Sequence, residues 1–110
     1  MATGAGERSQ EADAGRLEVR PDEHAVLVDG RPLGLTMREL QLLVTLAEHP
    51  QRIMTREELF AAVWHSEPRR ADRSVDVYVS RLRAKLAEAL PGTRLIHTHN
   101  GIGYRFSPDG

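Results

Sequence analysis

The stretch from Asp72 to Leu90 carries the side chains best suited to contact another molecule. At 3.6 residues per turn its aliphatic side chains form one stripe, which we predict to be core: Val75, Val79, Leu82 and Leu86. A second stripe combines cations, a hydroxyl, a small apolar group and an aromatic ring, from Ser74, Val77, Tyr78, Arg81 and Lys85. Guanidinium and hydroxyl groups donate hydrogen bonds to phosphates and base edges, so this face suits a nucleic-acid groove.

Catalytic and metal-binding patterns are weak by comparison. His97 and His99 share one face of a predicted strand, the geometry from which a metal site is built, but no third ligand is evident. Gly101-Ile102-Gly103 lies inside a predicted hairpin rather than at the start of a helix, so it is not a nucleotide-binding fingerprint. We therefore expect no enzyme activity, no catalytic residue, no bound metal and no cofactor.

Length and composition predict one soluble domain. A chain of 110 residues buries roughly 65% of its unfolded surface, which is enough for a core without disulfides or metals. The sequence contains no cysteine, and no apolar run approaches the ~20 residues of a membrane span. These features favour a cytoplasmic protein that does not enter a membrane.

The charge is unevenly distributed. Residues 1–68 carry seven arginines against twelve acidic residues, whereas residues 69–110 carry eight basic against four acidic residues. The net charge of −1 therefore hides a basic C-terminal part that includes the stretch at 72–90.

The N-terminal part predicts a leader followed by a small antiparallel sheet. Residues 1–15 are small and charged, so we expect a disordered leader or linker. Short strands are expected around Leu17–Val19, at Ala25–Val28 and at Arg31–Leu35, with a hairpin turn at Asp29-Gly30.

Two helices are predicted before residue 72, and both begin with a capping box. Thr36 is followed by Glu39, and Thr55 by Glu58, so each threonine accepts from the glutamate amide while the glutamate reaches back. The helices are expected at residues 37–48 and 56–64, and residues 65–71 form an exposed loop. Pro91-Gly92 ends the third helix.

The C-terminal segment predicts a β-hairpin. Strands at residues 93–98 and 104–106 flank Asn100-Gly101, a strong hairpin-turn signal. We expect an α+β domain over residues 16–107, with an N-terminal sheet, three helices and a C-terminal hairpin, and a tail at 108–110.

This arrangement is that of a winged helix-turn-helix, and two strings make the resemblance specific. R-S-V-D-V-Y-V-S-R-L-R-A-K-L, followed by H-T-H-N-G-I-G-Y-R-F, resembles the recognition helix and wing of OmpR/PhoB-type response-regulator effector domains. L-T-M-R-E-L-Q-L-L and T-R-E-E-L-F-A-A-V-W look like the first two helices of that family. The resemblance covers about residues 16–106 and includes the family's four-stranded N-terminal platform.

The resemblance implies a sequence-specific regulator of transcription that binds double-stranded DNA. The helix at 72–90 would lie in the major groove, and the wing around Asn100 would reach a minor groove. By position, Ser74, Val77 and Arg81 look like base readers. The positions that look like DNA-backbone contacts are Trp64, Arg73, Tyr78, Arg83, Thr98 and Tyr104. For Lys85 we favour a solvated side chain.

Two positions depart from the family pattern. The wing tip has Asn100 where many relatives have arginine, and the third helix has Ser80 where they often have a cation. Both departures remove positive charge. We expect a salt dependence shallower by roughly 0.9 in log–log slope for each lost phosphate contact.

The resemblance also implies partners. Relatives bind tandem direct repeats, with self-association on DNA, and contact RNA polymerase through the loop that corresponds to residues 65–71. Here Glu67, Arg69 and Arg70 would be the contacts. A simple connector is the alternative for this loop.

Two alternatives to this function stay open. In the first, the domain would be a protein-interaction module with weak or lost DNA binding. In the second, it would be an effector controlled by something other than the phosphorylatable receiver domain that usually precedes this domain in the family.

Overall fold

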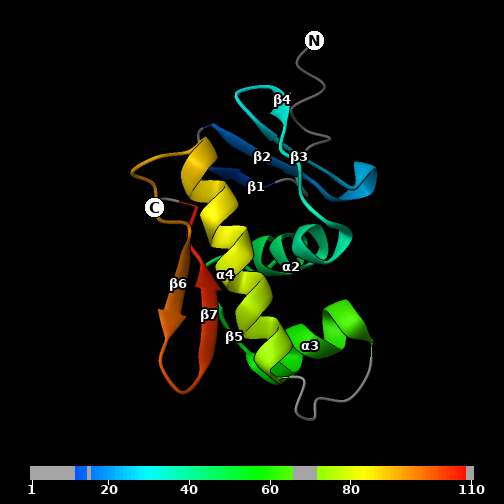
Figure 1. Ribbon diagram of the computed structural model, residues 1–110, viewed down its shortest axis with the longest axis vertical. Coiled ribbons are helices and arrows are strands. Elements are labelled where there is room, and N and C mark those ends of the chain that lie inside the picture. Colours follow the sequence, from blue (N-terminus) through cyan, green and yellow to red (C-terminus); the bar gives the residue numbers. More distant parts are fainter. Residues whose placement is uncertain (1–11, 15, 66–71, 109–110) are drawn as a thin grey trace.

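The computed structural model describes residues 12–14, 16–65 and 72–108, which form two antiparallel sheets and three α-helices (Figure 1). The elements in chain order are β1 (Ala12–Ala14), β2 (Leu17–Arg20), the 3-10 turn η1 (Pro21–Glu23), β3 (Ala25–Val28), β4 (Arg31–Pro32), α2 (Met37–Ala47), β5 (Ile53–Thr55), α3 (Arg56–Trp64), α4 (Asp72–Ala89), β6 (Ile96–His99) and β7 (Gly103–Phe106). The predicted fold class, a winged helix-turn-helix with an N-terminal sheet, is confirmed.

The N-terminal sheet has the order β1-β2-β3-β4, with every neighbouring pair antiparallel. Leu17 and Val19 are fully buried, as expected for the inner face of a strand with period-2 alternation. The predicted turn is present at Asp29-Gly30, with φ values of 53° and 81°. The last strand ends at Pro32 rather than Leu35, since the chain leaves the sheet after Leu33, whose amide still donates to the Val26 carbonyl over 2.8 Å.

Part of the predicted leader belongs to this sheet. Ala12–Ala14 form β1 and pair with β2 in the register Ala12↔Val19, so the segment 1–15 does not lie wholly outside the fold. The A-D-A sequence is three residues long and its apolar members are only alanines, so its pattern is too weak to predict a strand, and its pairing uses the backbone. The other predicted leader residues lie outside the described ranges.

Both predicted capping boxes are present. The Glu39 amide donates to the Thr36 hydroxyl over 3.2 Å, and the Thr36 amide donates to the Glu39 carboxylate over 2.8 Å. Thr55 and Glu58 repeat the arrangement at the start of α3, with distances of 3.1 and 2.9 Å. Local sequence therefore sets where α2 and α3 begin.

The C-terminal hairpin belongs to a second sheet, of order β5-β7-β6. The sequence did not predict β5, which precedes α3 and pairs with β7 so that Thr55 lies opposite Gly103. A Cβ built on Gly103 would lie 1.9 Å from the Met54 carbonyl oxygen, so only glycine permits this approach. The hairpin, which we call the wing (residues 96–106), is thus joined to the start of α3.

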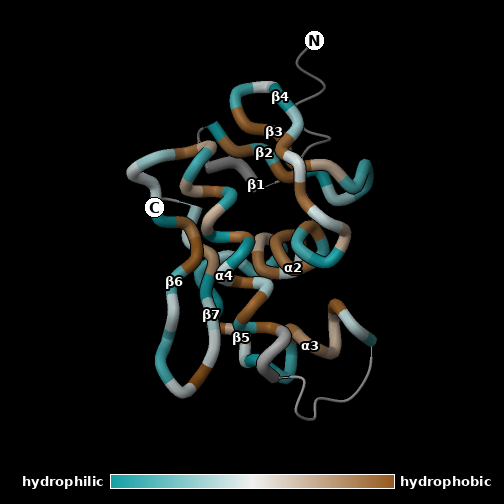
Figure 2. Tube along the Cα trace, in the orientation of Figure 1, coloured by the Kyte–Doolittle hydropathy of each residue, from teal (hydrophilic) through white to brown (hydrophobic). Residues whose placement is uncertain are grey.

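The helices pack between the two sheets around an aliphatic core. Leu42, Leu43 and Leu46 of α2 are fully buried, as is Leu82 of α4. Figure 2 shows apolar segments on the inner sides of the elements and alternating character along α4. The N-terminal sheet lies at one end of the molecule, whereas the wing tip, α3 and the beginning of α4 lie at the other (Figure 1).

Candidate nucleic-acid interface

Helix α4 divides into the two faces that its spacing predicts. The core stripe is buried, with exposed fractions of 0 to 5% at Val75, Val79, Leu82 and Leu86. The opposite side exposes Val77, Ser80, Arg81 and Ala84, which recur at helical spacing. Val77 is 45% exposed, so this side of the helix offers an apolar group as well as a cation.

Tyr78 and Arg81 contact each other on the edge of this exposed face. The Arg81 guanidinium carbon lies 5.3 Å from the centre of the Tyr78 ring, a cation–π geometry between residues three apart on one helix. Arg81 makes no hydrogen bond or ion pair with any other residue that the structure describes. Its donors therefore remain available to an external acceptor.

Trp64 lies behind Tyr78 and is partly buried. Its ring stacks on Phe60 at 5.0 Å and meets Tyr78 edge-on at 5.4 Å. The Arg38 guanidinium lies 4.8 Å from the Trp64 ring. The residue predicted as a backbone contact therefore also links α3 to α4 through aromatic packing.

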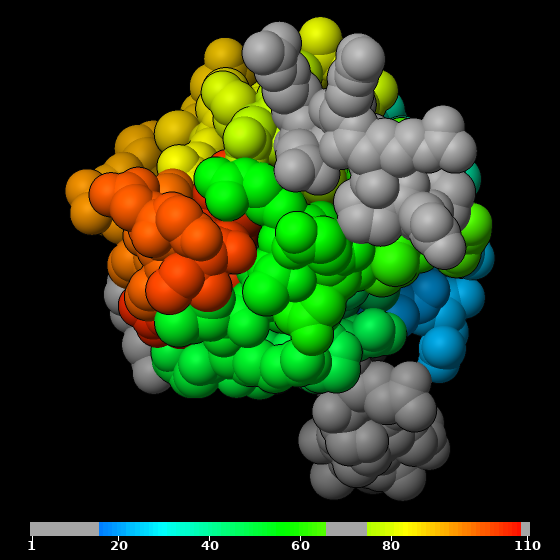
Figure 3. Space-filling model, turned by 90° about the horizontal axis from the view of Figure 1, so that it is seen from below, coloured from blue at the N-terminus to red at the C-terminus, as the bar shows by residue number. Residues whose placement is uncertain are grey.

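Arg83 joins α4 to the wing. Its Nη2 donates to the Thr98 hydroxyl on β6, so two residues predicted to hold the DNA backbone contact each other. The guanidinium also lies 5.4 Å from the Tyr104 ring on β7. The helix and the wing therefore present one continuous surface. Figure 3 shows the wing, in orange, beside α3, in green, at this end of the molecule.

Asp76 organises a second contact between the helix and the wing. Its carboxylate accepts from Arg56 of α3 over 2.8 Å and from the Tyr104 hydroxyl of β7. Burial raises the pKa of Asp76, but the hydrogen bonds from Tyr104 and Arg56 lower it by more, so its pKa falls below the ordinary value. Burial and the bond to Asp76 raise the pKa of Tyr104, which keeps the phenol protonated.

These contacts change the interpretation of Tyr104. The sequence predicts a backbone contact, but the side chain is 5% exposed and its hydroxyl donates to Asp76. An aromatic residue in a strand fits either role, and only the position of Asp76, 28 residues earlier, distinguishes them. The geometry favours Tyr104 as a support for the wing.

The wing tip consists of Asn100, Gly101 and Ile102, all exposed. The predicted turn is in place, with the Ile102 amide donating to the His99 carbonyl over 2.9 Å. Only Gly101 has positive φ, at 79°, so the turn differs from the two-residue form in which both central residues do. Ile102 is 52% exposed, an apolar tip that the sequence reading did not single out.

Along the wing strands, Arg105 bonds to His99 and its charge acts on His97. Arg105 Nε donates to His99 Nε2 over 3.1 Å, and Arg105 Nη1 donates to Gln51 over 2.6 Å. Burial lowers the pKa of His97, and the nearby Arg105 charge lowers it further. Within the described ranges, no three side chains of metal-binding type are gathered together.

Lys85 does not have the solvated role predicted for it. Its ammonium lies 2.7 Å from the carboxylate of Glu39, and the Glu39 side chain is only 2% exposed. The two residues are 46 positions apart, so local spacing carries no sign of the pair. Lys85 therefore joins α4 to the start of α2. We no longer count it among the side chains of α4 that could contact another molecule.

Several predicted contacts remain predictions. Glu67, Arg69 and Arg70 lie outside the described residues. Arg73 and Ser74 belong to the first turn of α4, and their roles stay predictions.

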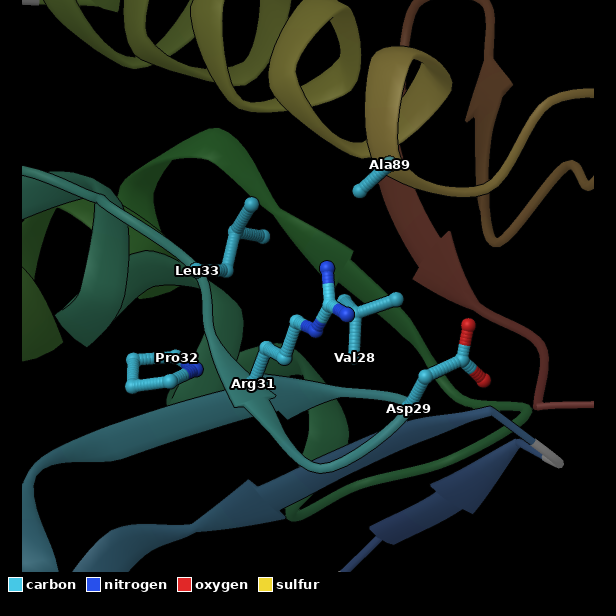
Figure 4. Close-up of a pocket in the computed structure, with 6 residues that line it drawn as sticks. All are labelled: Val28, Asp29, Arg31, Pro32, Leu33 and Ala89. Atoms are coloured by element: carbon cyan, nitrogen blue, oxygen red, sulfur yellow. The ribbon is translucent and has the colours of Figure 1, made fainter.

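A cavity of about 450 Å³ lies away from this surface, between the β3–β4 turn and the end of α4 (Figure 4). Its lining includes Asp29 and Arg31, together with apolar side chains. The Asp29 carboxylate accepts from Arg16 over 2.8 Å, so the acidic group of the cavity is already paired with a cation. Across the described part of the chain, no helix is both long and apolar enough to cross a membrane.

The exposed stripe of α4, joined to a hairpin wing, defines a winged helix-turn-helix domain. A family model described as "Transcriptional regulatory protein, C terminal" matches residues 30–106, from the β3–β4 turn to the end of β7. The chain belongs to this family, and the resemblance to OmpR/PhoB-type effector domains is confirmed.

Individual relatives agree with this assignment. The transcriptional regulatory protein SrrA of Staphylococcus aureus is 41% identical over 91 residues, which is 82% of this chain and 38% of SrrA. The DNA-binding domain of CpxR from E. coli superposes with a TM-score of 0.78 at 30% identity, covering 88% of this chain and 95% of that domain. The Klebsiella pneumoniae RstA DNA-binding domain, solved in complex with the RstA box, superposes with a TM-score of 0.77 at 33% identity. The match covers 89% of this chain and 97% of that domain.

Proposed function

We propose that this chain is the DNA-binding output domain of a response-regulator-type transcription regulator, acting on double-stranded DNA in the bacterial cytoplasm. One observation carries the proposal. The exposed stripe of α4 leaves Arg81 without a polar partner in the described chain, and the same helix is bonded through Arg83 to Thr98 of the wing. A helix and a hairpin held in one surface match the elements that a winged helix places in adjacent grooves.

Base reading falls to the exposed stripe. Arg81 can donate two hydrogen bonds to O6 and N7 of guanine, and Val77 can contact a thymine methyl group. Ser74, one turn earlier, can donate or accept. The RstA domain, which is 33% identical, was solved in complex with the RstA box, and this supports the same use of the fold here.

Backbone contacts lie around this stripe and determine register rather than sequence preference. We assign contacts with DNA phosphates to Arg73, Arg83 and Thr98, and to the indole N–H of Trp64. Asp76 and Tyr104 act behind them by holding the wing against α4. Asn100 lies at the tip of the wing and would enter the minor groove.

Binding-site selection from random duplexes, followed by mobility-shift titrations, tests the proposal. Arg81→Ala should weaken binding to the selected site by about 1–3 kcal/mol and relax one base position. Arg31→Ala is the matched control, since Arg31 is an exposed arginine on β4 at the opposite end of the molecule. Absence of any preferred sequence, or equal behaviour of the two variants, would contradict the proposal and favour a protein-interaction module.

The partners of the longer relatives are proposals for this chain as well, because it spans 38% of SrrA. We propose binding to tandem direct repeats about one helical turn apart, with contact between neighbouring copies on DNA. Duplexes carrying one or two selected half-sites, at varied spacing, test this directly. Cooperative binding should appear only near one-turn spacing.

RNA polymerase is the second proposed partner, contacted through Glu67, Arg69 and Arg70. Substituting all three by alanine should leave promoter binding intact and reduce transcription in a reconstituted assay. Intact transcription would make the loop a connector.

A further inference from the structure

Four side chains form a continuous series from the core to the surface of α4. Phe60, which is 5% exposed, stacks on Trp64 with ring centres 5.0 Å apart and an angle of 10°. Trp64 meets Tyr78 edge-on, at 5.4 Å and 70°. Tyr78 in turn lies under the guanidinium of Arg81 at 5.3 Å. The packed end of this series is fixed, and its outer end is the proposed guanine reader.

Trp64 is restrained from a further side. The Arg38 guanidinium lies 4.8 Å from its ring, so the indole has contacts from α2, α3 and α4. Restraint of Trp64 limits the motion of the Tyr78 ring that packs against it. The Tyr78 ring therefore packs against a side chain that has contacts from three helices.

Within the described part of the chain, the Tyr78 ring is the side chain that restrains Arg81. No carboxylate in the described chain pairs with it, in contrast to Arg56, which is held by Asp76. A long side chain loses rotamer freedom when it docks on a base, and prior restraint reduces that loss. A face-on ring restrains the guanidinium while leaving the edge donors free, which a carboxylate would not.

We infer that Tyr78 is a specificity-determining positioning residue that holds Arg81 in its base-reading orientation through its aromatic face. This role differs from the phosphate contact through the hydroxyl that the family resemblance implies. It rests on the proposed DNA-binding function, and it adds that sequence discrimination at one base pair depends on a side chain that does not touch that base.

Two substitutions separate the ring from the hydroxyl. Tyr78→Phe keeps the ring, and should retain discrimination at the base pair read by Arg81 within about twofold. Tyr78→Leu keeps apolar volume without a π face, and should reduce discrimination at that base pair by about three- to fivefold. In an Arg81→Ala background, Tyr78→Leu should have no further effect on discrimination, because the two residues act through one contact.

Opposite patterns would overturn the inference. If Tyr78→Phe weakens binding to all duplexes equally, Tyr78 is a phosphate anchor. If Tyr78→Leu acts equally with and without Arg81, the tyrosine is only a packing residue.

A measurement on the free chain keeps this test independent of DNA binding. The side-chain proton resonances of Arg81 should show a ring-current shift in the wild type and in Tyr78→Phe, and lose it in Tyr78→Leu. Absence of the shift in the wild type would refute the contact even if DNA binds normally. A normal shift with no preferred DNA sequence would refute the proposed function and, with it, the role in specificity, while leaving the contact itself intact. Circular dichroism on each variant confirms that it is folded.

Discussion

The ammonium of Lys85 on α4 lies 2.7 Å from the carboxylate of Glu39 on α2, and this carboxylate also accepts from the amide of Thr36. One glutamate therefore both caps the start of α2 and holds α4 against it. The Glu39 side chain is 2% exposed, whereas that of Lys85 is 38% exposed. Glu39 is the member of the pair whose charge depends on its partner for stabilisation.

Glu39→Gln should lower the free energy of unfolding by about 1–3 kcal/mol, since glutamine retains the capping hydrogen bond but leaves Lys85 without its counter-charge. Glu58→Gln is the matched control. Glu58 occupies the same position of the second capping box, and its ion pair with Arg52 is 40% and 51% exposed. The control should cost less than ~1 kcal/mol. Urea denaturation measures both, and equal costs would show that the burial of Glu39 does not matter.

Acid should destabilise the domain through Glu39 and Asp76. Burial raises the pKa of Glu39, but hydrogen bonds from Lys85 and Thr36 lower it by more, so the folded pKa lies below the unfolded value. The pKa of Asp76 is also lowered, by hydrogen bonds from Tyr104 and Arg56. Between the folded and unfolded pKa values of these groups, the unfolded state binds more protons than the folded state. Their contribution to stability is therefore present above about pH 5 and is lost as pH falls through the folded pKa values. The slope of unfolding free energy against pH should be smaller in Glu39→Gln.

Gly103→Ala should disrupt the wing sheet, because the added methyl would lie 1.9 Å from the Met54 carbonyl oxygen of β5. We expect a loss of at least about 2 kcal/mol of unfolding free energy. Gly34→Ala is the control, since a Cβ at that position has no atom within 4 Å. Its effect should stay within about 0.5 kcal/mol. A tolerated Gly103→Ala, measured by thermal unfolding, would mean that β5 and β7 separate easily.

Asn100→Arg should increase the affinity for DNA and steepen the log–log salt dependence by about 0.9, because the exposed wing tip would gain one phosphate contact. Thr93→Arg adds the same charge in the exposed loop after α4, at the end of the molecule opposite the wing tip. It should leave the slope nearly unchanged. Equal slopes for both variants would place the wing tip away from the DNA.

Features encoded by neighbouring residues were predictable from the sequence. The capping boxes at Thr36 and Thr55 place two helix starts correctly, and the 3.6-residue period separates the buried Val79 from the exposed Val77. The Asp29-Gly30 turn is also local. Each depends on side chains within a few positions, which is the range over which spacing carries information.

Features formed by distant residues were not predictable. Strand β5 is three residues long and pairs with β7, about 50 positions later, and the three residues of β1 are too few and too small to signal a strand. The Lys85–Glu39 pair and the Tyr104–Asp76 bond likewise join separate elements. Tyr78 and Tyr104 carry the same functional group and both lie beside guanidinium groups, but only Tyr104 donates its hydroxyl to Asp76, 28 positions earlier in the chain.

The pairing of β5 with β7 has a mechanical consequence. A lone two-stranded hairpin is only marginally stable, but here the wing continues a sheet whose third strand leads directly into α3. Contacts from Arg83 and Asp76 tie the same hairpin to α4. The distance between α4 and the wing is therefore set by contacts on both sides of the hairpin. If helix and wing enter adjacent grooves as proposed, a duplex whose grooves do not match this distance would have to bend or twist to fit, and its stiffness would contribute to selection at base pairs that the protein never touches.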